Sequence, residues 1–128
     1  MKTQALFKID SEHQPASFND VMKRLFPRRP ANAEHALAFL KRVRNTEFYR
    51  KQWRDYLKKQ YPEEARTKQG FKRIENRYFA ILVRLKSSGI LYSKSNQWKL
   101  SDSFYNYLTM SATLYNNWRE QEKEVEEK

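Results

Sequence analysis

The sequence predicts a mainly α-helical protein with one small β-hairpin. Apolar residues recur at steps of three and four along most of the chain, which is the periodicity of helices. Only two glycines and four prolines occur among 128 residues, too few for an all-β protein with many turns. A single pair of short β-prone runs, over residues 90–100, flanks Ser95-Asn96, where asparagine tolerates the positive φ of a tight turn.

The first 31 residues are expected to form an amino-terminal arm followed by one helix. Residues 1–16 fit either a short strand or a loose arm. Ser17 is a good helix cap, and the apolar stripe behind it predicts a helix over 17–26. Pro27-Arg28-Arg29-Pro30 then ends the helix and forms a stiff basic linker.

Two further helices are expected between the linker and Pro62. Asn32 can cap a helix over 33–44, and Thr46 can cap another over 47–61, which Pro62 ends. The side chains expected to face inward are Ala36, Leu37, Leu40, Val43, Tyr49, Trp53, Tyr56 and Leu57, with Phe39 beside them.

The fourth helix has the clearest limits. It opens at Thr67, and its inward face is expected to hold Phe71, Ile74, Tyr78, Ile81, Leu82 and Leu85. Gly89 occupies the left-handed position after the helix, where Ile90 can contact Leu85 as in a Schellman motif. After the hairpin, Ser101-Asp102 caps a last helix from about 102 to the mid-120s, so residues 102–128 comprise a carboxyl-terminal helix and a charged tail.

Positive charge is concentrated in the middle of the chain. Residues 23–99 hold 21 basic and 6 acidic residues, a net charge of +15, whereas residues 1–22 and 100–128 have net charges of −1 and −3. About half of the central basic residues are arginine, which pairs well with phosphate. A solvated lysine-rich surface and a membrane-surface protein fit this regional bias less well than a protein that binds a polyanion.

The sequence also argues against an enzyme, and no catalytic residue, metal site or cofactor is predicted. The chain has no cysteine, its two histidines, His13 and His35, are far apart, and no glycine-rich phosphate loop occurs. His35 fits a surface or capping role in the first turn of its helix.

No apolar run approaches the roughly 18 residues of a membrane span. A cytoplasmic protein near the nucleoid is therefore expected.

The order of elements resembles the winged helix-turn-helix over residues 32–101. The step Leu85-Lys86-Ser87-Ser88-Gly89-Ile90 is similar to the end of the recognition helix and the start of the wing in MarR-like and PadR-like regulators. Residues 94–101 resemble the returning wing strand and the cap of a dimerisation helix. The turn over 62–66 is longer and more acidic than in that family, and the helix over 17–26 is an addition to it.

The resemblance implies a DNA-binding surface with three parts. The fourth helix would enter the major groove with its amino-terminal half, and side chains off its apolar face there suit guanine and adenine edges. These are Lys68, Gln69, Lys72, Arg73, Asn76 and Arg77. The wing would contact phosphates or the minor groove through Lys94, Ser95, Asn96 and Lys99, and the third helix would hold the backbone through Arg50, Lys51 and Arg54. Individually, each of these side chains fits a solvated surface as well, and Trp53 and Trp98 fit core positions better than stacking platforms.

A homodimer is expected because the last helix is longer than the domain that can cover it. At 1.5 Å per residue the helix would be about 35 Å long, whereas a domain of about 70 residues has a radius of gyration near 11 Å. Apolar side chains far along the helix would be left in water in a monomer. The expected interface residues are Phe104, Leu108, Leu114, Tyr115 and Trp118, with help from Phe18, Met22 and Phe26.

The sequence thus predicts a dimeric protein that binds double-stranded DNA selectively, as a transcription regulator. A plasmid partition, replication or nucleoid protein with the same fold is an alternative, and so is a winged-helix adaptor that binds other proteins. No residue specifies a small-molecule effector.

Overall fold

The computed structural model describes residues 15–127, with side chains to residue 121, so most of the expected arm lies outside the described residues. The predicted class, mainly α-helical with a small antiparallel hairpin, is confirmed. The elements are α1 (Phe18–Leu25), α2 (Ala31–Asn45), η1 (Arg50–Gln52), α3 (Trp53–Gln60), η2 (Glu64–Arg66), α4 (Lys68–Ser87), β1 (Leu91–Lys94), β2 (Gln97–Leu100) and α5 (Ser103–Glu127).

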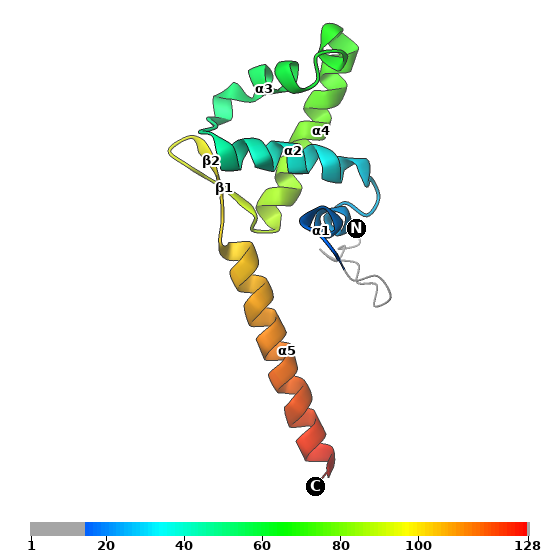
Figure 1. Cartoon of the computed structure of the whole chain (residues 1–128), viewed down its shortest axis with the longest axis vertical. Helices are drawn as coiled ribbons and strands as arrows, with labels where there is room; N and C mark the ends of the chain where they lie inside the picture. Colours follow the sequence, from blue (N-terminus) through cyan, green and yellow to red (C-terminus); the bar gives the residue numbers. More distant parts are fainter. Residues whose placement is uncertain (1–14, 128) are drawn as a thin grey trace.

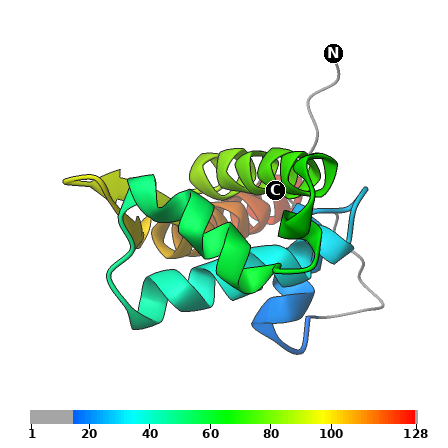
Figure 2. The same cartoon turned by 90° about the horizontal axis from the view of Figure 1, so that it is seen from above.

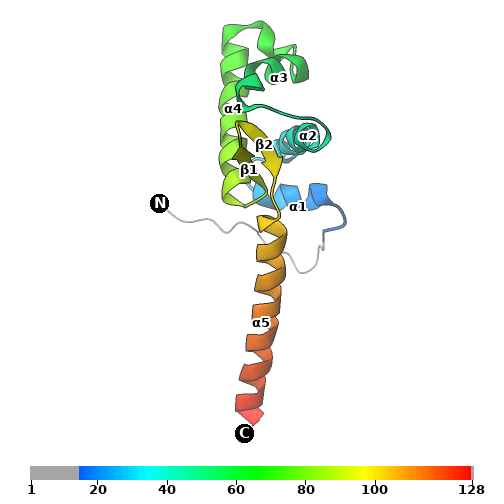
Figure 3. The ribbon, with the colours of Figure 1, turned by 90° about the vertical axis from the view of Figure 1, so that its left-hand side faces the viewer.

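The helices before the hairpin form one domain, from which α5 projects. Helices α4 and α2 lie on opposite sides of the domain, α3 lies between them, and the hairpin covers one end (Figure 2, Figure 3). Helix α1 packs beside α2, and its Met22 and Leu25 belong to the same core as the other helices. Helix α5 follows the hairpin and extends away from the domain as a single rod (Figure 1).

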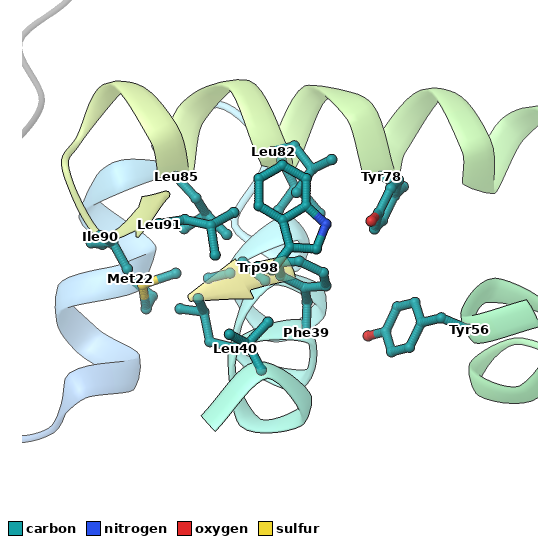
Figure 4. Packing of buried hydrophobic residues seen from close by; sticks show 14 of the residues in the cluster. Met22, Phe39, Leu40, Tyr56, Tyr78, Leu82, Leu85, Ile90, Leu91 and Trp98 are labelled. Atoms are coloured by element: carbon teal, nitrogen blue, oxygen red, sulfur yellow. The ribbon is translucent and has the colours of Figure 1, made fainter. Parts of the chain in front are cut away.

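Phe39 of α2 lies at the centre of the core, where aromatic rings from four other segments meet it. Its ring centroid is 5.3 Å from Phe48, 5.9 Å from Tyr56, 5.6 Å from Tyr78 and 6.4 Å from Trp98. These contacts join α2 to α3, α4 and β2 (Figure 4). Aromatic pairs at these separations add to the stability that burial provides, so a single cluster positions the surface elements.

Three of the predicted helix limits are confirmed in detail. The Ser17 side chain accepts a hydrogen bond from the Asp20 N–H at 3.3 Å, and the Thr67 side chain accepts one from the Gly70 N–H at 3.0 Å. Gly89 has a φ of 81°, and the Ile90 N–H donates to the Leu85 carbonyl at 3.1 Å. The residues that end α4 before the hairpin therefore form the cap that the sequence predicts.

The predicted starts of the second and third helices are wrong. Helix α2 begins at Ala31, because Pro30 already has helical φ and ψ, so Asn32 lies inside the helix. Thr46 ends α2 instead of opening the next helix, since both its N–H and its hydroxyl donate to the Arg42 carbonyl. Helix α3 starts only at Trp53, after η1.

The residues between α2 and η1 are extended because they pair with the hairpin. The Trp98 N–H donates to the Phe48 carbonyl at 2.8 Å, and the Arg50 N–H donates to the Asn96 carbonyl at 2.7 Å. Tyr49 forms an isolated bridge with Gln97. Residues 48–50 thus pair along β2 and the hairpin turn, and this pairing holds η1 against the turn.

Gly70 is needed for the turn between α3 and α4. A Cβ at this position would lie 2.1 Å from the backbone carbonyl oxygen of Glu64. We expect Gly70→Ala to lower the free energy of unfolding by about 1–3 kcal/mol in urea titrations, although alanine favours helix. Asn76→Ala, at an exposed position of the same helix, is the control and should change little. A stabilised Gly70→Ala protein would contradict this close packing.

Across residues 15–127, no helix has the length and hydropathy that a membrane-spanning segment requires.

Candidate nucleic-acid interface

The amino-terminal half of α4 presents a polar and basic face to solvent. Helical geometry turns Ile74 and Tyr78 into the core, which leaves the intervening positions outward. Exposed on this half are Lys68, Gln69, Lys72, Arg73 and Asn76. Lys72 Nζ lies 3.2 Å from Glu75 Oε2, whereas Arg73 has no ion-pair partner within the described residues. Five of the six predicted positions on this helix are therefore accessible on one surface.

Arg77, the sixth predicted position, is engaged within the protein. Its Nη1 lies 3.5 Å from Glu64 Oε2, its guanidinium lies 4.7 Å from the centre of the Tyr61 ring, and only 21% of its side chain is exposed. Position 77 is next to the buried Tyr78 on the edge of the helix that η2 covers. Arg77 thus secures the turn between α3 and α4 and is turned away from the exposed basic face.

His35 joins the same cluster from α2. Its Nδ1 is 2.8 Å from Tyr61 Oη, and the two rings meet edge to face with centroids 5.1 Å apart. Burial, together with the Arg77 guanidinium, lowers the pKa of His35, and burial raises the pKa of Tyr61. Both groups are therefore neutral near pH 7, and His35 has a structural role instead of the surface or capping role expected for it.

The hairpin turn and η1 bring a second set of polar and basic residues together. Ser95 and Asn96 have φ values of 54° and 63°, as the tight turn requires, and the Arg50–Asn96 hydrogen bond holds the turn against η1. The Arg50 guanidinium also lies 5.4 Å from the Trp98 ring centroid. These contacts orient Arg50 and place it, with Lys51, beside the hairpin turn.

A groove of about 740 Å³ separates this set from α4. One wall comes from η1 and the hairpin turn, and the other comes from the carboxyl-terminal half of α4. Aromatic and basic side chains share its lining, which comprises Tyr49, Arg50, Lys51, Trp53, Tyr78, Phe79, Leu82, Val83, Lys86, Ser95, Asn96 and Trp98. The groove can accommodate a flat or elongated group whose negative charge meets the cations.

Three other predicted contacts lie outside the groove lining. Arg54 packs over Trp53, with 5.0 Å between its guanidinium carbon and the ring centroid. Lys94 is exposed on β1. Lys99 lies beside a different hollow, which it shares with Arg44 and Tyr92.

Sequence reasoning missed two parts of this surface. Phe79 and Val83 are 43% and 68% exposed on α4, and their spacing of four residues outside the inward stripe was the available signal. Arg84 lines a small hollow together with Arg28 and Arg29 of the linker. No pattern in the sequence could have paired residues so distant with α4.

The predicted interface residues on α5 divide into two groups. Phe104 and Leu108 are half-buried, and Phe104 packs against the domain core. Leu114, Tyr115 and Trp118 are 60%, 58% and 57% exposed. Of the additional interface residues predicted in and just after α1, Phe18 is exposed, whereas Met22 and Phe26 are buried in the protein's own core and cannot contact a partner.

Among the described residues, no three histidine, aspartate or glutamate side chains gather as metal ligands would. No family model, curated protein or solved structure matches the chain.

Proposed function

We propose that the protein is a winged-helix protein that binds double-stranded DNA as a dimer and regulates transcription. The observation that carries this proposal is the exposed basic face on the amino-terminal half of α4, together with a hairpin turn and a basic 3-10 turn that lie across the groove from the carboxyl-terminal half of the same helix. An elongated polyanion that follows this surface would meet charge from three elements. Regional positive charge of this kind releases counterions when it neutralises phosphates, which favours nucleic acid as the ligand.

The proposed mode of binding assigns a different task to each element. Helix α4 enters the major groove, where Lys72 and Arg73 suit guanine O6 and N7, and Gln69 and Asn76 suit adenine N6 and N7. Arg50 and Lys51 contact phosphates, together with the polar hairpin turn. Lys68, Lys94 and Arg54 add charge at the margins of the same surface.

Two residues take roles that differ from the sequence expectation. Arg77 supports the turn before α4 through Glu64 and Tyr61, so we assign it a positioning role instead of a base contact. Lys99 lies away from the groove, so we assign it at most a peripheral phosphate contact. On the other flank of α4, Arg84 and the linker arginines are suitable for phosphates of the same duplex.

The dimer is proposed from the exposed apolar side chains of α5. Leu114, Tyr115 and Trp118 lie together on a helix that extends beyond the domain (Figure 1). A cluster of this kind usually marks an interface. Two copies joined through α5 would present two DNA-binding surfaces, as a regulator that reads an inverted repeat requires.

The experiment that tests the proposal is selection of bound fragments from random duplex DNA, followed by anisotropy titrations. A regulator is expected to enrich an inverted repeat and to bind it at least about a thousandfold more tightly than random duplex. Equal affinity for every duplex would favour a partition or nucleoid protein instead. No binding to any duplex would contradict DNA binding and favour an adaptor for other proteins.

A further inference from the structure

The apolar stripe of α5 repeats every seven residues. Phe104, Ser111 and Trp118 form its central line, flanked by Tyr107 and Leu114 on one side and by Leu108 and Tyr115 on the other. Beyond its first turns, α5 extends away from the domain (Figure 3). Within the described residues, the Trp118 ring packs against the Tyr115 ring of the same helix, with 6.3 Å between the two centroids.

A second copy of this helix is large enough to cover the stripe. Tyr107, Leu114, Tyr115 and Trp118 of the stripe, and Met110 at its margin, are each 57–68% exposed. Each would bury roughly 100 Å² in a helix pair, since large aromatic side chains bury 150–250 Å² when fully covered. The pair would then bury about 1,000 Å² in total, which reaches the lower limit for a specific interface.

The charges of α5 distinguish between the two directions in which such helices can pair. Residues 120–127 contain five glutamates and one lysine, a net charge of −4. A parallel pair would place two such segments side by side, and their charges would repel. An antiparallel pair places each acidic segment beside the start of the partner's α5 and near its domain, whose residues 23–99 have a net charge of +15.

The side-chain sizes of Ser111 and Trp118 also favour antiparallel pairing. A parallel pair in register would stack Trp118 on Trp118 and leave Ser111 facing Ser111, which crowds one layer and leaves a gap in the next. An antiparallel pair with its two-fold axis between Leu114 and Tyr115 places each Trp118 against the small Ser111 of the other copy. Each Leu114 then faces Tyr115.

We propose that α5 pairs with α5 of a second copy in antiparallel orientation, about a two-fold axis between Leu114 and Tyr115. This inference rests on the proposed dimer and specifies its geometry. The two Ser103 positions, where the helices leave their domains, are then roughly 35 Å apart along the pair. Because the amino-terminal half of α4 lies at the end of each domain that is far from α5 (Figure 1, Figure 3), the two DNA-binding surfaces are farther apart than the 34–36 Å of one helical turn.

Disulfide cross-linking tests the orientation, since the natural chain contains no cysteine. Two single-thiol proteins, Leu108→Cys and Gln121→Cys, are oxidised separately and as a mixture. In the antiparallel pair, position 108 faces position 121 of the partner, whereas the two 121 positions are about 20 Å apart, too far for a disulfide. We expect the mixed disulfide to form at least about tenfold faster than the disulfide between two Gln121→Cys chains.

A control variant and the mass of the wild-type protein distinguish a dimer with a different helix orientation from a monomer. Thr109→Cys, on the opposite face of α5, mixed with Gln121→Cys should give no mixed disulfide. Circular dichroism confirms that each variant is folded, and sedimentation of the wild-type protein gives its mass. A dimer in which Gln121→Cys cross-links to itself, or in which no mixed disulfide forms, overturns the antiparallel pairing alone. A wild-type monomer overturns the dimer as well, while duplex binding by the same protein is measured independently.

Discussion

The double variant Lys72→Glu/Arg73→Glu is expected to bind duplex DNA about a hundredfold or more weakly than the wild-type protein. Both side chains are exposed on the amino-terminal half of α4. Each base contact contributes roughly 1–3 kcal/mol, and a glutamate in place of the basic residue adds repulsion. Fluorescence anisotropy with a labelled duplex at fixed salt measures the change.

The matched control is Lys41→Glu/Arg44→Glu, which changes the net charge by the same amount. Both residues are exposed on α2, on the side of the domain opposite α4 (Figure 3). Its affinity should fall far less, since only the long-range field changes. Equal losses in the two double variants would mean that the binding surface is elsewhere.

The second large effect is expected at α5. Leu114→Glu/Trp118→Glu should produce a folded monomer at protein concentrations at which the wild-type protein is dimeric. The substitutions remove two central apolar contacts and bury charges in their place, so the dimer dissociation constant should rise about a hundredfold or more. Sedimentation velocity at tens of micromolar measures the change, and circular dichroism checks that the helices persist.

Thr109→Glu/Asn116→Glu is the control, because it adds the same charge to the opposite face of α5. Both positions are exposed, and neither belongs to the apolar stripe. This control should remain dimeric and should keep its affinity for DNA, whereas the monomeric variant should bind an inverted repeat more weakly. A wild-type protein that is monomeric at tens of micromolar would contradict the dimer.

Local side-chain chemistry explains which parts of the fold could be predicted from the sequence. Ser17, Thr67 and Gly89 limit their helices through contacts within a few residues, so each limit was visible in a short window. Thr46 was ambiguous, because a threonine hydroxyl can cap the next helix or donate to the one before. Thr46 ends α2 because Phe48, two residues later, pairs with the hairpin, and a short stretch of sequence does not reveal that long-range contact.

The candidate site likewise includes residues that the sequence predicts and residues whose surroundings depend on tertiary packing. The exposed half of α4 follows from helical periodicity, so Lys72, Arg73 and Asn76 could be assigned to the surface directly. Arg77 could not, since its position at the edge of the inward face becomes enclosed only when η2 brings Glu64 against it. The groove between α4 and the hairpin likewise depends on tertiary packing of segments that are far apart in the sequence.

The salt dependence of duplex binding tests whether the basic surface of α4, η1 and the hairpin binds the phosphates of DNA. The association constant of the wild-type protein is measured by anisotropy between 50 and 200 mM monovalent salt. If about six phosphates are contacted, the affinity should fall about a thousandfold across this range, because bound phosphates release their counterions. An association constant that barely changes between the two salt concentrations, or the absence of binding at 50 mM, would contradict binding of DNA phosphates by this surface.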